Sequence, residues 1–440
     1  MNRKRAAILC FIFFLFFYGI TSRTDLQLTD EVAVFASAIS LAEQGDLAID
    51  ELRWLNDQIN IGDTGRDGRL YAKYFPGNII TAAAAYRLAS LPSDQPYLWD
   101  VPKDLNSAME AVPLAASNTG ARTALKINAV FGALALTMLF LLTLRRFNWK
   151  TAVVTVLFVG VCTDWWYQSR GFLSEVGAGA LLMTSLYFAD LQRPHASGLA
   201  LGLSLLFRPP NLVAFPVWFR AAWGKRALVS VWGILLGGFG LLFFNWIRFG
   251  SVLDFGYQDE GFLPHLADGL YGLLLSPGRS IFLYSPLLTL AIPGVWMFLK
   301  KDKALTLAAA STVVLYILMT ASWHSWDGGW SWGSRLLTPI LPVLGFLSAP
   351  VIDFAWGRRS DFAVVLVLAL LGFVIQLLAL AVNPLEVLVN AVTFGGVEYN
   401  ETVNSIENSW LALQWRSLRD WQPCILDAYT LRQWFGNCGH

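Results

Sequence analysis

The chain begins with Arg3-Lys4-Arg5 followed by the apolar run Ala6–Ser22, AAILCFIFFLFFYGITS. A helix needs roughly 20 predominantly apolar residues to cross a bilayer, and about 17 is the short limit. No cleavage site of small residues follows this run, so we expect a retained membrane anchor and not a signal peptide that is removed. Because basic residues beside a span stay in the cytoplasm, the N-terminus is predicted to lie inside.

The rest of the chain has the composition of a membrane protein. Of its 440 residues, 55% are hydrophobic and only 14% are charged, whereas soluble domains carry about 25% charged residues. Eight further apolar segments predict spans: Arg122–Leu144, Thr151–Tyr167, Phe172–Leu191, Ala227–Ile247, Ser280–Leu299, Ala304–Ser322, Leu336–Trp356 and Phe362–Val382. With the first segment, these give nine crossings.

The basic residues of the short loops predict one more feature, a broken hairpin. These residues are Arg145, Arg146, Lys150, Arg193, Lys225, Arg226, Lys300, Lys301, Lys303, Arg358 and Arg359. All of them fall on the cytoplasmic side only if Ala196–Ala222 enters and leaves by the same face. Arg208-Pro209-Pro210 lies at the middle of that segment, where proline breaks a helix. We therefore predict an all-α integral membrane protein with about nine spans plus one broken helical hairpin, its C-terminus outside.

The predicted topology divides the chain into a transmembrane domain, 1–383, and a short external tail, 384–440. The domain includes a long first external loop, 23–120, for which interfacial helices are expected. Cys424 and Cys438 lie in the tail and could form a disulfide if it faces an oxidising compartment. Two free thiols are the alternative.

An acidic pair, Thr29-Asp30-Glu31, stands just beyond the first span. Apolar residues at helical spacing follow it, which predicts a short amphipathic helix along the interface, with Thr29 as its N-cap. Acids in a first turn favour the helix dipole, so the pair could simply begin a helix. An acid at the outer surface could equally accept a proton from a sugar hydroxyl as a general base.

Three more elements carry ionisable side chains near the same face. Lys73 lies among aromatics in Tyr71–Gly77, where it could bind a lipid phosphate or merely snorkel to the interface. Glu175 stands at the start of a span, where an ionisable residue suggests function, although it could also serve the helix N-terminus. Arg208 could meet a phosphate or pair with an acid.

The last two elements follow later in the chain. Ser276-Pro277-Gly278-Arg279 places an arginine at a span entrance, as a phosphate ligand or a headgroup anchor. Trp323–Arg335, WHSWDGGWSWGSR, interleaves four tryptophans with glycine. Indole faces stack on sugar rings, and His324 and Asp327 could bind hydroxyl groups. An interfacial aromatic belt is the alternative interpretation.

Taken in order, these elements resemble the GT-C superfamily of membrane glycosyltransferases. The nearest branch is related to protein O-mannosyltransferases and the lipid A aminoarabinose transferase. The resemblance covers most of the chain up to about Pro350. It rests on the Asp30-Glu31 pair, the Tyr71–Pro76 element, Glu175, the Ser-Pro-Gly-Arg turn, and the Trp/Gly strip that ends in Arg335 and is followed by Pro339 and Pro342.

The resemblance implies a glycosyltransferase, acting on a hexose or a pentose, that uses a polyprenyl-phosphate-linked donor. Transfer would take place on the extracytoplasmic face of the plasma or inner membrane, to a hydroxyl of a lipid, glycan or protein. Asp30 would be the base, and Glu31 and Glu175 would shape the site or assist. The resemblance assigns the donor phosphate to Lys73, Arg208, Arg279 and Arg335, and the sugar or acceptor to Tyr257, His324, Trp326, Asp327 and Trp330. Some superfamily members use a divalent metal; Asp30 and Glu31 are the candidate ligands, and the sequence does not decide the matter.

Other classes of function fit the sequence less well. The net charge of +1 gives no electrostatic support for nucleic-acid binding. A transporter or flippase of lipid-linked sugars is the main alternative, but it should show ionisable residues at mid-membrane depth in several spans. Phe362–Val382 has none. A non-catalytic scaffold would not explain why the acids, the lysine and the Trp/Gly strip are all predicted on one face.

Overall fold

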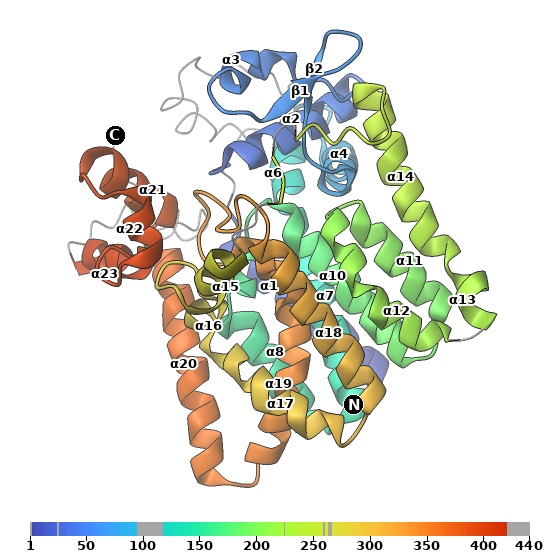
Figure 1. Cartoon of the computed structure of the whole chain (residues 1–440), viewed down its shortest axis with the longest axis vertical. Helices are drawn as coiled ribbons and strands as arrows, with labels where there is room; N and C mark the ends of the chain where they lie inside the picture. The colour runs from blue at the N-terminus through green and yellow to red at the C-terminus, as the bar shows by residue number, and fades with distance from the viewer. Residues whose placement is uncertain are drawn as a thin grey trace.

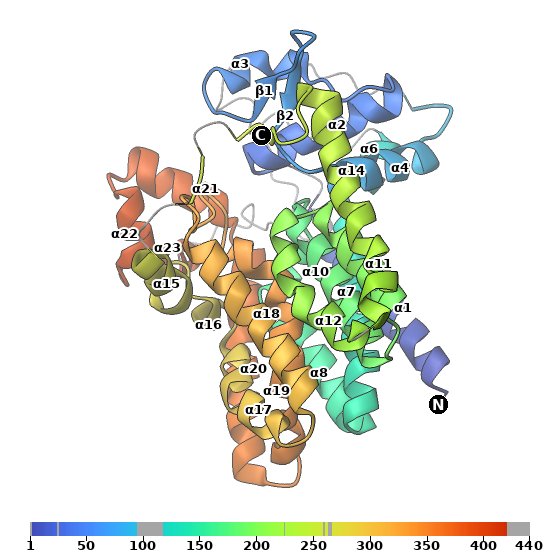
Figure 2. The same ribbon diagram turned by 45° about the vertical axis from the view of Figure 1, so that its right-hand side comes forward.

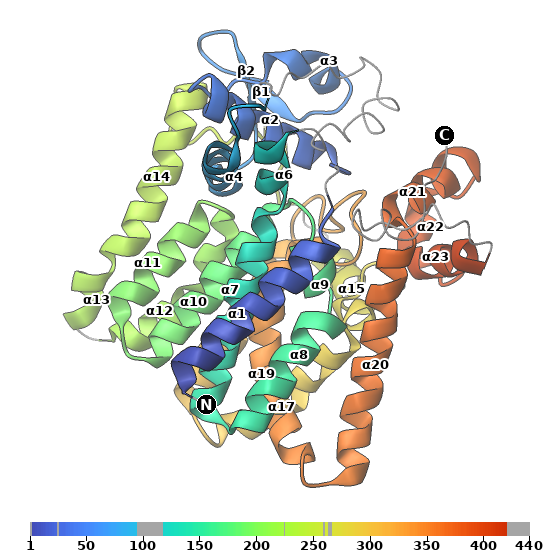
Figure 3. The ribbon, with the colours of Figure 1, turned by 180° about the vertical axis from the view of Figure 1, so that it is seen from behind.

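The protein is a bundle of helices with a smaller layer across one end, as the computed structural model shows in Figures 1 and 2. The structure describes residues 2–23, 26–94, 118–223, 225–257, 260–262 and 266–419. The external loop forms the end layer, and the C-terminal helices pack beside the same end of the bundle (Figure 3). Cys424 and Cys438 lie outside the described residues, so their pairing stays a prediction.

The elements of the bundle come from two stretches of the chain. The first contributes α1 (Arg3–Thr21), α7 (Ile127–Arg146), α8 (Trp149–Cys162), α9 (Trp165–Ser169), α10 (Ser174–Asp190), α11 (Pro194–Leu205), the 3₁₀ helix η3 (Pro209–Ala214), α12 (Phe215–Ala222), α13 (Lys225–Ser230) and α14 (Trp232–Phe249). The second contributes α15 (Leu266–Leu275), α16 (Ile281–Tyr284), η4 (Pro286–Leu290), α17 (Ala291–Leu299), α18 (Lys303–Ala321), η5 (Arg335–Ile340), α19 (Leu341–Ala355) and α20 (Arg359–Ala381).

The end layer and the C-terminal group are built from shorter elements. The layer contains α2 (Thr29–Glu43), η1 (Asp50–Leu52), α3 (Arg53–Asn56), β1 (Gly62–Thr64), β2 (Leu70–Ala72), α4 (Pro76–Ala89) and α6 (Thr119–Leu125). The C-terminal group contains α21 (Pro384–Val389), the π-helix η6 (Asn390–Phe394), α22 (Tyr399–Asn404) and α23 (Trp410–Arg419).

Six helical segments of the described chain are long and apolar enough to cross a membrane, which makes this a multi-pass membrane protein. They are Arg3–Thr21, Thr119–Arg146, Ala227–Phe249, Lys303–Ala321, Arg335–Ala355 and Arg359–Ala381. Each matches one of the nine predicted spans. The other three predicted spans are covered by shorter or interrupted helices, namely α8 with α9, α10, and α16 with η4 and α17. Pro286 accounts for one interruption because proline removes a helical hydrogen bond.

The predicted break at Arg208-Pro209-Pro210 is present in the structure. Helix α11 ends at Leu205, and a regular α-helix resumes only at Phe215. Between them lies η3, which begins with the two prolines. Because Arg208 has an extended backbone, its side chain can turn away from both helices.

The ends of several helices are joined by ion pairs at the end of the bundle opposite the external layer. The buried Asp190 at the end of α10 pairs with Arg145 at 2.9 Å and with Arg146, both on α7. Asp302, just before α18, pairs with Arg146 at 3.1 Å and with Arg220 of α12 at 3.2 Å. Arg145 and Arg146, which were predicted to be cytoplasmic, therefore lie at this end, and part of their charge is neutralised within the protein.

The external layer departs from the prediction in two ways. The amphipathic helix expected after Asp30 is present as α2, but all of its residues from Glu31 to Ser40 are buried. It therefore packs as a core helix of the layer and does not lie with one face in the interface. The layer also contains an antiparallel hairpin, β1–β2, so the fold is not purely α-helical. The Asp67-Gly68 pair closes it, because Gly68 supplies the positive φ of 77° that such turns require.

Helices α11 and α14 pack closely because glycines face each other across the contact. A Cβ atom added at Gly237 would lie 1.9 Å from the carbonyl oxygen of Gly202, and one added at Gly202 would lie 1.9 Å from that of Gly233. The spacing Gly198–Gly202 and Gly233–Gly237 is the small-residue pattern that lets membrane helices approach each other. Backbone contact thus sets the distance between these two helices.

We expect Gly237→Ala to destabilise the protein, because the added methyl group forces α11 and α14 apart. Overpacking of this kind costs typically about 1–3 kcal/mol. Thermal unfolding of the purified protein in detergent should show a lower midpoint than that of the unmodified protein.

The neighbouring Gly238→Ala is the matched control. A Cβ at Gly238 meets no atom within 4 Å, and alanine favours a helix over glycine by up to about 1 kcal/mol. This variant should be as stable as the unmodified protein or slightly more so. Equal effects of the two substitutions would contradict the close packing described here.

Candidate active site

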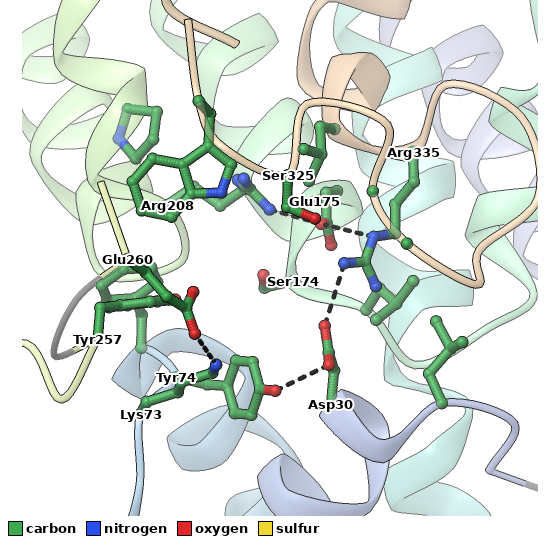
Figure 4. A pocket seen from close by; sticks show the side chains of 18 of the residues that line it. Asp30, Lys73, Tyr74, Ser174, Glu175, Arg208, Tyr257, Glu260, Ser325 and Arg335 are labelled. Carbon is green, nitrogen blue, oxygen red and sulfur yellow. Dashed lines mark hydrogen bonds and ion pairs between the residues drawn. The ribbon is translucent and has the colours of Figure 1, made fainter. Parts of the chain in front are cut away.

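A cavity of about 620 Å³ opens where the external layer meets the bundle. Its lining comes from the starts of α2 and α10, the segment after β2, the Arg208-Pro209-Pro210 break, the loop between α14 and α15, and the strip that follows α18. Figure 4 shows the charged side chains of these elements pointing toward one another across the cavity. Segments far apart in the sequence therefore converge on one space.

Asp30, in the first turn of α2, lies at one side of the cavity with two partners. Arg335 donates to its Oδ2 at 3.1 Å, and the hydroxyl of Tyr74 donates to its Oδ1 at 2.8 Å. Burial alone would raise the pKa of Asp30, but the charge of Arg335, the Tyr74 hydrogen bond and the charge of Lys73 outweigh it and lower this pKa below its usual value. The same carboxylate raises the pKa of Tyr74, on top of a larger effect of burial. Asp30 is thus an ionised acceptor at neutral pH.

Glu175 holds two arginines in place at the inner side of the cavity. Its Oε1 accepts a hydrogen bond from Arg208 at 2.5 Å and lies 3.7 Å from Nε of Arg335. The glutamate side chain is only 3% exposed and belongs to the first turn of α10. Because a buried carboxylate needs charged partners, this geometry fixes the positions of both guanidinium groups.

Lys73 and Glu260 form the third ion pair, near the opening of the cavity. The Nζ of Lys73 lies 2.5 Å from Oε1 of Glu260 and 5.4 Å from the centre of the Tyr257 ring. The other carboxylate oxygen of Glu260 lies 3.6 Å from Nε2 of His324. Every cation of the described cavity lining, Lys73, Arg208 and Arg335, thus has a carboxylate partner.

Aromatic rings form much of the remaining wall. Tyr257 packs against Phe75 and, edge to face, against Trp323, with ring centres 6.0 and 5.9 Å apart. Trp330 also lines the cavity and is 40% exposed. The cavity therefore offers flat apolar faces beside charged groups, an arrangement suited to a sugar joined to a phosphate.

Glu31 does not line the cavity, although the sequence grouped it with Asp30. It is fully buried, pairs with Arg23 at 2.8 Å, and accepts hydrogen bonds from the backbone N–H groups of Gln27 and Phe172 at 2.8 and 3.0 Å. It also accepts from the N–H of Leu28, so Leu28 and not Thr29 occupies the N-cap position. Consecutive helical residues point about 100° apart, which is why two adjacent acids face different surroundings.

Arg279 also lies outside the cavity lining. Its guanidinium is buried under the Trp/Gly strip, where it donates to the carbonyl oxygens of Gly329, Ser331 and Gly333 and stacks on the Trp410 ring with a separation of 4.8 Å. A buried arginine with these partners has a structural role. It supports the irregular strip from behind.

Trp326 and Asp327 belong to the strip but point away from the cavity. The Trp326 ring lies against Gly272 of α15, where an added Cβ would meet it at 1.9 Å. Asp327 accepts a hydrogen bond from the hydroxyl of Tyr399 at 2.5 Å. The strip is a series of turns, so some of its side chains pack in the protein interior and others reach the cavity.

Two ionisable residues of the described cavity lining were missed by sequence reasoning. Tyr74 lies inside the quoted Tyr71–Gly77 element but was not singled out, and the alternation of its neighbours gives no sign that it faces Asp30. Glu260 lies in an irregular loop without a recognisable motif. Only the fold brings it to Lys73, 187 residues earlier in the chain.

The residues present do not fit a metal site built on the Asp30-Glu31 pair. Both oxygens of Glu31 are engaged by Arg23 and backbone N–H groups, away from the cavity. In the part of the chain that the structure describes, no group of three or more His, Cys, Asp or Glu side chains is placed to hold a metal ion.

Comparisons with known proteins identify the fold. No protein-family model matches the chain, and no curated protein is similar to it in sequence. Among solved structures, it is similar to ArnT from Cupriavidus metallidurans in the apo state, with a TM-score of 0.52 and 14% identity over 93% of this chain and 67% of ArnT. The same protein bound to undecaprenyl phosphate gives a TM-score of 0.51 and 13% identity over 98% and 75% of the two chains.

A more distant match is the oligosaccharyltransferase of Archaeoglobus fulgidus, with a TM-score of 0.47 and 11% identity over 84% of this chain and 55% of that one. ArnT is the lipid A aminoarabinose transferase, a member of the GT-C superfamily. The GT-C fold predicted from the order of the sequence elements is therefore confirmed.

The structural role of Arg279 predicts that Arg279→Lys destabilises the protein although it keeps the charge. Lysine has a single ammonium group and cannot satisfy several diverging carbonyl groups or stack on an indole as a guanidinium does. Leaving buried acceptors without donors costs about 1–3 kcal/mol each. The midpoint of thermal unfolding should fall.

Arg416→Lys is the matched control for that experiment. Arg416 is exposed on α23 and also donates to a carbonyl oxygen, that of Glu407. Its replacement should leave the unfolding midpoint within error of the unmodified protein. A stable Arg279→Lys protein would instead return Arg279 to the set of candidate phosphate ligands.

Proposed function

We propose that this protein is a membrane glycosyltransferase that moves a sugar from a polyprenyl-phosphate-linked donor to an acceptor hydroxyl. The observation that carries the proposal is the cavity in which an ionised carboxylate, Asp30, lies beside the cations Lys73, Arg208 and Arg335. A base and a set of cations facing one space are what such a transfer needs. The acceptor can belong to a lipid, a glycan or a protein.

The fold supports the nature of the donor. ArnT, whose fold this chain shares, has been solved with undecaprenyl phosphate. In this chain the cavity lies where the external layer meets the bundle. The turn between α17 and α18, which follows Leu299 and leads to Lys303, lies at the opposite end of the bundle (Figure 2). By the tendency of basic loops to stay inside, the end with the cavity is extracytoplasmic and the N-terminus is cytoplasmic. Nine full crossings and one broken hairpin belong to the same proposal.

The proposed chemistry is a single displacement at the anomeric carbon. The acceptor oxygen forms a bond to that carbon as the bond from the carbon to the phosphate oxygen breaks, and the electron pair of this bond leaves with the prenyl phosphate. Asp30 takes the proton of the acceptor hydroxyl. One base opposite the departing phosphate is sufficient for inversion.

The ion pairs allow the cations to stabilise the leaving phosphate more strongly as the reaction proceeds. The donor is a phosphodiester, and its departure as a monoester adds one negative charge to the phosphate. At the same time, the proton neutralises Asp30 and weakens its pair with Arg335. The positive charge of Arg335 is then available to the leaving phosphate, as expected of preorganised electrostatic stabilisation. Glu175 keeps the guanidinium group in position throughout.

Transport of a lipid-linked sugar is less well supported. Proton-coupled transporters carry ionisable residues at mid-membrane depth, whereas α20 has none between Phe362 and Ala381. The ion pairs described here lie at the cavity and at the opposite end of the bundle. Neither position indicates a relay through the membrane.

The central test is Asp30→Asn, which keeps the size of the side chain but removes its basicity. We expect the transfer rate to fall by roughly 100-fold or more, the usual contribution of a general base. The measurement is release of prenyl phosphate when the purified protein is incubated with a panel of prenyl-phosphate sugars and acceptors. Asp57→Asn is the control, because Asp57 is exposed at the end of α3. Normal transfer by a folded Asp30→Asn protein would remove Asp30 from the mechanism.

The lowered pKa of Asp30 predicts the pH dependence of transfer. Since the carboxylate stays ionised below its usual range, Asp30 should cause no loss of rate between about pH 8 and 5. Tyr74→Phe removes a hydrogen bond to the ionised form, so the pKa of Asp30 should rise and the acid side of the profile should shift to higher pH.

Tyr71→Phe is the control for this profile, because its hydroxyl donates to Asp67 at 2.7 Å, outside the cavity lining. Its profile should match that of the unmodified protein. An unchanged acid side in Tyr74→Phe would show that the titration of Asp30 does not govern the rate.

A further inference from the structure

The charged groups that line the described cavity are balanced before any ligand arrives. The three cations Lys73, Arg208 and Arg335 face three carboxylates, and each cation contacts at least one of them. A phosphate ligand adds negative charge to this balanced set. It therefore has to take at least one cation from its carboxylate partner.

The three carboxylates differ in how firmly they are held. Glu175 and Asp30 belong to the first turns of α10 and α2, and each has at least two partners, with Arg335 shared between them. Glu260 belongs to no helix or strand, and its carboxylate has one cation within hydrogen-bond distance, Lys73. Of the three, it is the carboxylate that can leave its cation at the lowest cost.

The backbone around Glu260 is held independently of its carboxylate. The N–H of Glu260 donates to the carbonyl oxygen of Tyr257 at 2.8 Å, and the N–H of His324 donates to that of Gly261 at 3.0 Å. Phe262 also packs edge to face on Trp323, with ring centres 5.3 Å apart. The side chain can therefore change rotamer while the segment stays attached to the strip.

The Glu260 carboxylate also has a second polar partner nearby, His324. Nε2 of His324 is 3.6 Å from its Oε2, just beyond hydrogen-bond distance. A small rotation away from Lys73 would bring the two groups together. The ammonium of Lys73 would then be free, and a compact charge with three donors is well suited to a phosphate group.

We propose that Glu260 is an exchangeable counter-ion, which occupies Lys73 in the empty cavity and gives it up to the phosphate of the ligand. The ligand chemistry is a phosphate monoester or diester; on the function proposed above, it is the phosphate of the lipid-linked donor and product. Lys73 is placed for this role because it lines the same cavity as Asp30, and the next residue, Tyr74, donates a hydrogen bond to the Asp30 carboxylate. A phosphate bound at Lys73 would therefore share the cavity with the base.

The opposite interpretation is that the Lys73–Glu260 pair fastens the loop across the cavity and helps to build the phosphate site. The two interpretations predict opposite signs for one substitution. If Glu260 competes with phosphate, its neutralisation tightens phosphate binding. If the pair builds the site, the same change weakens binding.

The experiment measures binding of a short-chain polyprenyl monophosphate to the full-length protein in detergent, by calorimetry, for the unmodified protein and Glu260→Gln. We expect binding to be roughly two- to fivefold tighter in the variant, the scale of breaking a partly exposed ion pair. A second arm with inorganic phosphate separates the charged group from the lipid tail. Unchanged or weaker binding of prenyl phosphate by Glu260→Gln would overturn the proposal.

Two further variants make the result specific. Asp268→Asn removes a negative charge from the exposed first turn of α15, close in sequence to Glu260, and should leave binding unchanged. In Lys73→Gln, phosphate should bind more weakly, and adding Glu260→Gln should no longer tighten it. An equal gain from Glu260→Gln with or without Lys73 would show general electrostatics and overturn the exchange.

The experiment distinguishes failure of the counter-ion proposal from failure of the proposed function. If the unmodified protein binds no prenyl phosphate, the proposed donor is wrong, while the inorganic phosphate arm still tests the exchange at Lys73. If it binds prenyl phosphate and Glu260→Gln binds no more tightly, the donor stands and the counter-ion role falls.

Discussion

The ion pair between Asp30 and Arg335 is the contact on which the site depends, because it joins two parts of the molecule across 305 residues of sequence. Asp30 lies in the first turn of α2 in the external layer, and Arg335 begins η5, which leads into the buried helix α19. The Arg335 side chain is only 11% exposed, so its charge needs a partner in the protein. The layer and the bundle are therefore held at the distance that satisfies both charges, and this distance defines the cavity.

The order of the sequence elements was sufficient to predict the fold, but not the direction of each side chain. The apolar segments, the break at Arg208-Pro209-Pro210 and the helix after Thr29 follow from hydropathy, proline chemistry and periodicity. In the described chain, six of the nine segments are helices long enough to cross a membrane, the break is present, and the helix is present but buried. Eight of the twelve proposed site residues line the cavity. The others include Glu31 and Arg279, whose side chains could serve a site but instead bind buried partners. Glu31 pairs with Arg23 and backbone N–H groups, and Arg279 donates to backbone carbonyl groups.

The sequence-based expectations differ from the structure where tertiary contacts, and not the local sequence, decide where a side chain points. Arg279 and Arg335 both follow glycine- and serine-rich turns, and nothing local distinguishes the arginine that supports the strip from the one that faces Asp30. Glu260 is the opposite example. It lies in no recognisable motif, and only its contact with Lys73 places it in the site. The hairpin β1–β2 was missed for a simpler reason. Its Asp67-Gly68 turn lies between strands of only three residues, too short to show an alternating pattern.

The two ends of the bundle use the same residue types for different purposes. At one end, Asp190 and Asp302 pair directly with arginines of α7 and α12. At the other end, the pairs line a space because irregular segments, the proline break and the glycine-rich strip, keep the helices from closing over them. Charged residues alone therefore do not make the site. The site also needs these irregular backbone segments, which keep the charged groups apart around a cavity. One of the carboxylates, Glu260, lies on such a segment, and its side chain can change partner while the backbone stays in place.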